Sequence, residues 1–261
     1  MSRLTEYRPE NFLDNYRADK PLGLPKEYRC THWVLPVRFD NKGFNLPLVT
    51  VNPRVAIKER ISIAWLDCRE KGLGEAIGRD LGRLVAPLVD ENTVLFTPPS
   101  KKSIGMATQV LATAIQSTRN QNLELVKIQG CKTAELERFF ELQSDQIDRV
   151  ADMQLWHAMG DHGDRFGVNY TPVTGTRKSM WLGVSEQERL TGKRVIAIDD
   201  VATTRATINA WELLLSQECR VKEEYVATAA IEGDFQMEAN HLALIRLPEI
   251  HGPIDMGMFG K

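Results

Sequence analysis

From residue 75 onward, helix-like and strand-like segments alternate along the chain. Apolar residues at helical spacing indicate amphipathic helices, and short apolar runs between them indicate buried strands. This alternation favours an α/β fold, a parallel sheet flanked by helices, because each helix carries the chain back to begin the next parallel strand. The expected strands are 93–97, 123–128, 194–198 and 226–231, and the expected helices cover 77–88, 104–115, 136–147 and 208–215.

The first seventy residues follow a different pattern. Residues 1–30 are polar without a sustained period, whereas 34–39 and 46–51 predict a β-hairpin with a four- to six-residue turn around Asp40-Asn41-Lys42-Gly43. Residues 61–66 are expected to add a third strand. We therefore expect three regions. They are an N-terminal arm and hairpin over 1–70 that forms a candidate hood, a core over 71–250, and a C-terminal tail over 251–261.

Charge and composition exclude several classes of protein. Lys and Arg total 33 against 35 Asp and Glu, so no bulk positive field attracts nucleic acid or an anionic membrane. No apolar run approaches the ~20 residues needed to cross a bilayer, and the N-terminus lacks the apolar stretch of a secretory signal. The 4 cysteines are far apart and are expected to be reduced thiols. We expect a cytoplasmic protein without nucleic-acid or membrane partners.

Residues 195–207 carry the most informative motif, Val-Ile-Ala-Ile-Asp-Asp-Val-Ala-Thr-Thr-Arg-Ala-Thr. An apolar strand ends in the carboxylates Asp199 and Asp200, and a threonine-rich turn then opens into a helix. Ligands of parallel α/β sheets bind beyond the carboxyl ends of strands, where a helix N-terminus offers N–H groups and about half a positive charge. A phosphate suits this helix end, and carboxylates accept hydrogen bonds from vicinal hydroxyls. The motif therefore predicts a site for a phosphorylated sugar.

The same segment resembles the 5-phosphoribosyl-1-pyrophosphate signature of type I phosphoribosyltransferases, a hydrophobic strand followed by Asp-Asp-Val-x-Thr-Thr-Gly-x-Thr. The resemblance implies that fold, with Asp199 and Asp200 holding the ribose hydroxyls and residues 203–207 wrapping the 5′-phosphate. The positions that match are Asp199, Asp200, Val201, Thr203, Thr204 and Thr207. The implied donor-binding set is Asp199, Asp200, Val201, Ala202, Thr203, Thr204, Arg205, Ala206 and Thr207.

Arg205 is the departure from the signature, since the family has glycine there. Glycine adopts a positive φ and lets a phosphate approach the main chain, freedoms that arginine lacks. Two interpretations follow. Either the loop is altered, or the guanidinium adds a direct ligand for the phosphate, because arginine makes bidentate contacts with phosphate oxygens.

Two further segments resemble parts of the same family. Residues 97–107 are similar to its pyrophosphate-binding loop in a form closest to the orotate type, which implies that Lys101 or Lys102 contacts pyrophosphate. Two lysines at a helix N-terminus are also unfavourable unless an anion is present. Arg177 and Lys178 fall where the family has its flexible catalytic loop, and we expect 151–175, rich in Gly, Asp and His, to be mobile. The implied catalytic residues are Lys101, Lys102, Arg177 and Lys178.

The resemblance implies transfer of the phosphoribosyl group from its pyrophosphate to a nucleobase, with release of pyrophosphate, as in nucleotide salvage. A purine is preferred, because 180–194 looks similar to purine-base members. Mg²⁺ is expected as the cofactor, carried by pyrophosphate and ribose oxygens rather than bound directly by the protein, and a homodimer is expected. The expected partners are the donor and a nucleobase or nucleoside monophosphate.

The sequence leaves two alternatives to a transferase. A non-catalytic phosphoribosyltransferase-fold protein that senses a nucleotide and regulates a partner is the main one, and Arg205 motivates it. A dinucleotide-binding enzyme is disfavoured, because no G-x-G-x-x-G motif follows a strand. The site for the base stays unassigned, although Trp33, Trp181 and Phe235 are aromatic candidates for stacking.

Overall fold

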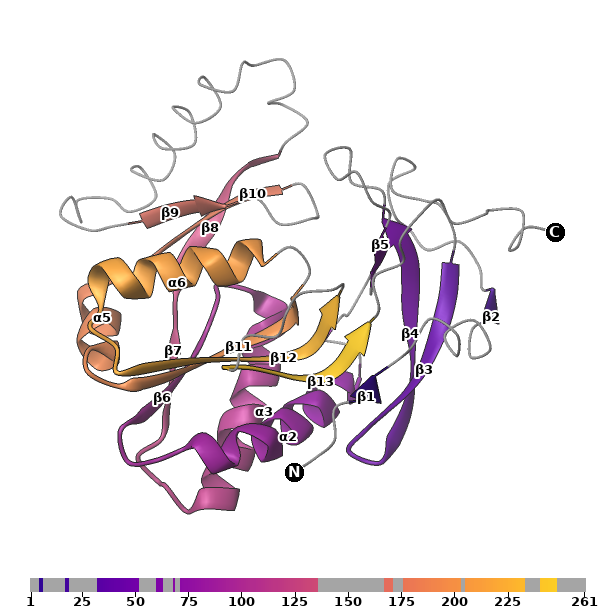
Figure 1. Cartoon of the computed structure of the whole chain (residues 1–261), viewed down its shortest axis with the longest axis horizontal. Coiled ribbons are helices and arrows are strands. Elements are labelled where there is room, and N and C mark those ends of the chain that lie inside the picture. Colours follow the sequence, from indigo (N-terminus) through magenta and orange to yellow (C-terminus); the bar gives the residue numbers. More distant parts are fainter. Residues whose placement is uncertain are drawn as a thin grey trace.

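A computed structural model gives the arrangement of the chain (Figure 1). Among the residues that it describes, the strands form a six-stranded parallel sheet and two antiparallel sheets of four and three strands. None of the described helices is long and apolar enough to cross a membrane. The described residues are 5–6, 17–18, 32–51, 60–62, 68, 71–135, 167–170, 176–202, 205–232 and 240–247.

The parallel sheet has the strand order β1-β13-β12-β11-β6-β7, and every neighbouring pair is parallel. Its central strands are apolar and buried on both faces, as expected when helices cover both sides. The predicted α/β fold, a parallel sheet flanked by helices, is confirmed. The strands are β1 (Thr5–Glu6), β6 (Thr93–Thr97), β7 (Glu124–Lys127), β11 (Arg194–Ala202), β12 (Glu223–Glu232) and β13 (His241–Leu247).

Helices cover the two faces of this sheet (Figure 1). One face packs against α2 (Leu73–Val85), which continues into a short 3-10 turn, η3 (Ala86–Leu88), and against α3 (Lys101–Thr118). The other face packs against α6 (Ala206–Glu218), with α5 (Val184–Leu190) beside it. The predicted apolar stripe of α6 is confirmed, since Ile208, Trp211, Leu214 and Leu215 are all buried.

The predicted amphipathic helix over 104–115 is confirmed as part of α3, but its most buried face lies beside the predicted stripe. Ile104, Leu111 and Ile115 are only partly buried, and only Ala107 of the predicted stripe is fully buried. The reason is that α3 packs against α2 as well as the sheet, and small side chains allow this close approach. A Cβ added to Gly82 of α2 would lie 2.5 Å from Thr113 Cβ. The buried residues of α3 are Ser103, Met106, Ala107, Val110, Thr113 and Ala114.

The N-terminal antiparallel sheet has the order β2-β3-β4-β5 and contains the predicted hairpin. Its turn is shorter than predicted, with only Asp40 and Asn41 between the paired residues Phe39 and Lys42. Both turn residues have positive φ, 49° and 62°, as two-residue hairpin turns of type I′ require. The strands are β2 (Arg17–Ala18), β3 (His32–Phe39), β4 (Lys42–Val51) and β5 (Arg60–Ser62).

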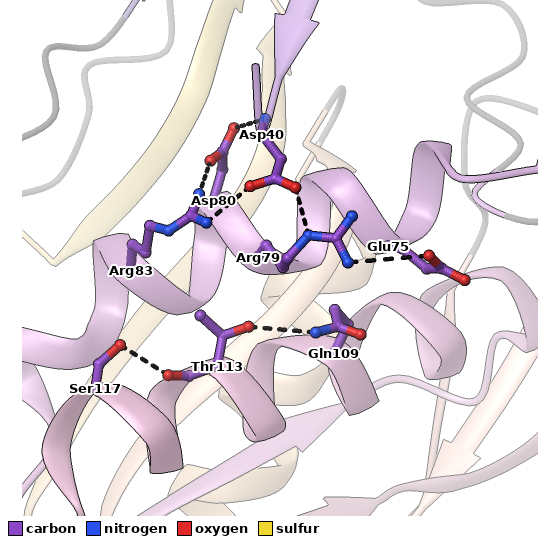
Figure 2. A network of polar contacts seen from close by, with 8 residues as sticks. All are labelled: Asp40, Glu75, Arg79, Asp80, Arg83, Gln109, Thr113 and Ser117. Carbon is purple, nitrogen blue, oxygen red and sulfur yellow. Dashed lines mark hydrogen bonds and ion pairs between the residues drawn. The ribbon is translucent and has the colours of Figure 1, made fainter. Parts of the chain in front are cut away.

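Asp40 attaches this hairpin turn to α2 (Figure 2). Its carboxylate accepts from Arg79 Nε at 2.6 Å and from Arg83 Nη2 at 2.7 Å, and its main-chain N–H donates to Asp80 Oδ2 at 2.8 Å. The two arginines hold the pKa of Asp40 below its ordinary value, mainly through these hydrogen bonds. The division of the chain at residue 70 stays a prediction, and β1, from the predicted arm, pairs with β13 of the main sheet.

The third sheet has the order β8-β10-β9 and corrects the prediction for 151–175. Part of that expected mobile loop, Gly167–Tyr170, is a strand. Short polar strands such as these carry no clear hydrophobic period, which is why the sequence did not reveal them. The predicted helix over 136–147 lies outside the described residues. The strands are β8 (Gln129–Glu135), β9 (Gly167–Tyr170) and β10 (Thr176–Trp181).

Candidate functional site

The two strands that precede the predicted ligand loops are neighbours in the main sheet. β6 leads through 98–100 into α3, and β11 leads through 203–205 into α6. Because β6 and β11 are parallel and paired, their carboxyl ends lie at the same edge of the sheet. The fold therefore brings the starts of α3 and α6 to one edge of the sheet (Figure 1). Asp199 and Asp200 lie near the carboxyl end of β11, at the same edge.

Strand β11 runs further than predicted. It was expected to end at residue 198, but Val201 and Ala202 still pair with Ala230 and Ile231 of β12. The pairing passes over Asp200, whose carboxylate Oδ1 accepts the N–H of Val201 at 2.9 Å. The two acids thus lie within the last residues of an extended strand rather than after it.

Asp199 and Asp200 differ in their surroundings. Asp199 is only 6% exposed, and its Oδ1 accepts hydrogen bonds from Ser103 Oγ at 3.2 Å and from the N–H of Asp200 at 2.9 Å. Asp200 is half-buried. Of the two carboxylates, Asp200 is therefore the more accessible to a ligand, while Asp199 is engaged with the protein.

Burial is the main cause that raises the pKa of Asp199 well above its ordinary value, and the neighbouring Asp200 carboxylate raises it further. The hydrogen bonds from the Asp200 N–H and from Ser103 act in the opposite direction, because they favour the charged form. Tyr170 of β9 belongs to the same electrostatic environment. Its pKa is raised by burial and, secondarily, by Asp199.

Arg205 has the backbone conformation that the family's glycine would provide. Its φ is 58° and its ψ is 8°, in the left-handed region, at the N-cap of α6. The expectation that arginine cannot take this conformation is wrong. Its side chain is 14% exposed, and Nη2 contacts Glu212 Oε1 at 3.1 Å, nearly two turns along α6. The surrounding structure holds Arg205 in a conformation that costs an L-residue about 1–2 kcal/mol.

The remaining residues of the signature lie in different settings. Ala206 and Thr207 are the first two residues of α6 and are half-buried, and Ala202 is buried within β11. Thr203 and Thr204 lie outside the described residues. Neither α6 nor α3 has an acidic residue in its first turn, so no side chain there competes with an anion for the helix N-terminus.

Lys101 and Lys102 are the first two residues of α3, as predicted, and only their main chain is described. The loop before them is fixed by packing against the third sheet. A Cβ on Gly130 of β8 would lie 2.4 Å from Pro99 Cγ and 2.5 Å from the carbonyl oxygen of Ser179. Only glycine at position 130 allows β8 to approach the loop this closely.

Arg177 and Lys178 were expected in a flexible loop, and that location is wrong. Both lie in strand β10, where Lys178 pairs with Tyr170 of β9 and Lys132 of β8. The register with β8 shifts between Arg177 and Lys178, as at a bulge. Their catalytic role stays a prediction.

Sequence reasoning missed Ser103, which donates to Asp199, and Tyr170, whose pKa Asp199 helps to raise. Both are buried, Ser103 completely. Trp181, a candidate for base stacking, packs in the interior and donates from Nε1 to Gln129 Oε1 at 2.8 Å. No described residues form a group of three or more potential metal ligands. The other aromatic candidates are outside the described side chains.

Similarity to known proteins was found only with solved structures, since no protein-family model and no curated protein matches the chain. The protein TT1426 from Thermus thermophilus is 16% identical, with a TM-score of 0.38 over 72% of this chain and 90% of that one. A purine phosphoribosyltransferase from Pyrococcus horikoshii is 12% identical, with a TM-score of 0.36 over 66% and 82%.

An adenine phosphoribosyltransferase from Thermoanaerobacter pseudethanolicus is 13% identical, with a TM-score of 0.39 over 66% of this chain and 81% of that one. Phosphoribosyltransferases are thus among the solved structures that this chain resembles. Because the three TM-scores are below 0.5, the chemistry of these proteins does not transfer to this chain through the likeness alone.

Proposed function

We propose that this chain binds 5-phosphoribosyl-1-pyrophosphate at the edge formed by β6 and β11 and transfers its phosphoribosyl group to a nucleobase, preferably a purine. The observation that carries the proposal is the convergence of the Asp199–Asp200 pair with the starts of α3 and α6. The signature over 195–207 supports the assignment of the donor.

Each part of the edge suits one part of the donor. Asp200 would accept a hydrogen bond from a ribose hydroxyl, and Asp199 would hold Asp200 in place. The first turn of α6, with Thr207, would bind the 5′-phosphate through N–H and hydroxyl groups. Lys101 and Lys102, at the start of α3, would balance the charge of pyrophosphate.

In the proposed reaction, the bond from C1′ to the pyrophosphate oxygen breaks and a bond from C1′ to a ring nitrogen forms. Pyrophosphate leaves with the bonding electrons, and the proton of the ring nitrogen passes to solvent. The protein's task is to position the reactants and stabilise the departing polyanion. Mg²⁺, a hard cation that prefers oxygen ligands, would neutralise pyrophosphate charge next to Asp200, carried mainly by oxygens of the donor.

A screen of nucleobases with the donor and Mg²⁺, monitored for pyrophosphate release, tests the proposal. We expect release with at least one purine, and its loss in Asp200→Asn. Donor binding without release for any base would favour the alternative, a nucleotide sensor. This alternative is supported by Arg205, which contacts Glu212 and stands at the position where the family signature has glycine. A wild-type protein that does not bind the donor would contradict both.

A further inference from the structure

Ser103 joins the two halves of the candidate site. It lies in the first turn of α3 and is completely buried, and its hydroxyl donates to Oδ1 of Asp199, 96 positions along the chain, at 3.2 Å. The segment that carries Lys101 and Lys102 is therefore bonded to the acid pair at the end of β11.

The bond of Ser103 reflects its place in the first turn of α3, since the residue four positions earlier, Pro99, lies before the helix. The other described hydroxyls of α3 that donate hydrogen bonds do so to the carbonyl four residues earlier, each at 2.8 Å. Such local bonds are the common state of helical serine and threonine. Ser103 instead reaches out of its helix to another element. The three local donors are Thr108, Ser117 and Thr118, which bond to Ile104, Thr113 and Ala114.

The bond to Ser103 continues into the main chain of the site. Oδ1 of Asp199 accepts from Ser103 and also from the N–H of Asp200, and Oδ1 of Asp200 accepts from the N–H of Val201. A shift of the first turn of α3 would therefore move the Asp199 carboxylate. That movement would in turn change the position of the main chain at Asp200. Buried hydrogen-bonded chains of this kind have few alternative arrangements.

We propose that Ser103 is a positioning residue that couples pyrophosphate at the start of α3 to the sugar phosphate held at Asp200 and α6. This inference rests on the proposed function and adds an energetic link between its two subsites. Such a link is reciprocal, so each ligand raises the affinity for the other by the same factor. Serine acts here through Asp199 and need not touch either ligand.

Calorimetric titrations of pyrophosphate and ribose 5-phosphate, separately and together with Mg²⁺, measure the coupling, because this pair has no base that can leave and so cannot react. In the wild type we expect each ligand to raise the affinity for the other about fivefold. In Ser103→Ala, this factor should fall to about one, whatever the change in the affinity for either ligand alone. Ser103→Thr keeps the hydroxyl and should restore the coupling.

Thr113→Val is the matched control, because it removes another buried hydroxyl from the same helix, one that accepts from Gln109 Nε2 (Figure 2). It should retain the wild-type coupling. If Ser103→Ala does not fold, Ser103→Cys keeps the volume with a weaker donor and should give reduced coupling. Full coupling in Ser103→Ala or Ser103→Cys, or equal loss in Thr113→Val, overturns the inference. Wild-type binding of both ligands without coupling also overturns it, whereas no binding of either contradicts the proposed function.

Discussion

The main-chain N–H of Asp200 donates to Oδ1 of Asp199 over 2.9 Å, so the buried carboxylate holds the main chain of its more accessible neighbour. The two adjacent acids thus differ in role. Asp199 bonds to the protein, whereas Asp200 is partly open to solvent. A buried carboxylate next to a second one destabilises its own charged form. Such a cost is expected where stability is given up for a functional arrangement.

Asp199→Asn should therefore stabilise the fold at neutral pH. Because the pKa of Asp199 is raised, the folded state binds a proton that the unfolded state has lost, so stability falls as pH rises from about 4 through the raised pKa. Asparagine removes the charge but can still accept the bond from Ser103. Thermal unfolding from about pH 4 to 8 should show a higher Tm and a flatter profile than the wild type.

Above the raised pKa of Asp199, the same variant should bind the donor at least about tenfold more weakly than the wild type, since the acid pair then loses a charge. Asp200→Asn is the control, expected to lose affinity without a comparable gain in Tm. An unchanged Tm profile in Asp199→Asn would show that burial does not penalise the charge at this position.

Replacement of both Lys101 and Lys102 by Ala should weaken pyrophosphate binding at least about tenfold, because each charge-assisted contact contributes ~1.5–3 kcal/mol. Binding of a nucleoside monophosphate should change less, since it lacks the group expected at α3. The control replaces Lys193 and Lys222, which lie before β11 and β12 at the opposite edge of the sheet. The measurement is calorimetric titration of both ligands against both double variants. Equal losses of pyrophosphate affinity in the two variants would mean that the overall charge of the protein, rather than these two lysines, causes the loss.

The sequence predicted the elements with strong periods most closely. Strand β6 has the predicted bounds, Thr93–Thr97, and the apolar residues of α6 are those expected from helical spacing. These elements bury continuous apolar runs or stripes, which is the signal that pattern analysis detects. The bond from Ser103 to Asp199 has no local signal, because it depends on the pairing of β6 with β11.

Turn chemistry and close packing account for the other differences. Asp40 and Asn41 tolerate positive φ, so two residues suffice where a longer turn was expected. The face of α3 was misplaced because its packing is set by glycines of α2, Gly78 and Gly82, which lie in another segment. Pattern analysis of one helix cannot detect its partner's small residues.

Gly82→Ala should destabilise the protein by about 1–3 kcal/mol, because the added Cβ would lie 2.5 Å from Thr113 Cβ and 3.0 Å from the carbonyl oxygen of Val110. Gly105→Ala in α3 is the matched control, since nothing lies within 4 Å of its added Cβ. There alanine should stabilise the helix by up to ~1 kcal/mol. Denaturant unfolding of both variants measures the difference, and equal effects would contradict the close packing of α2 on α3.

Asp40→Asn tests the attachment of the hairpin to α2. Asparagine tolerates the positive φ, so the substitution removes mainly the charge that pairs with Arg79 and Arg83. Because the pKa of Asp40 is lowered in the folded state, its contribution is present above about pH 4 and is lost as pH falls through the lowered value. We expect a loss of ~1 kcal/mol at pH 7 by urea unfolding, and less at low pH. A loss that does not depend on pH would point to packing instead.

Arg205→Gly separates the two interpretations of the departure from the signature. Position 205 already has φ 58°, so glycine can keep the same main-chain path, and any change in ligand binding reports on the guanidinium.

In Arg205→Gly, relief of about 1–2 kcal/mol of backbone strain should offset the loss of the contact with Glu212, worth ~0.2–1 kcal/mol, so stability should not fall. We expect the affinity for the phosphoribosyl donor to fall about tenfold by calorimetry, because the guanidinium would otherwise supply charge-assisted hydrogen bonds to the 5′-phosphate. Glu212→Gln, which keeps the arginine and removes its partner's charge, should retain donor binding. Tighter donor binding in Arg205→Gly, or transferase activity that the wild type lacks, would instead identify the arginine as an obstruction that makes this chain a sensor.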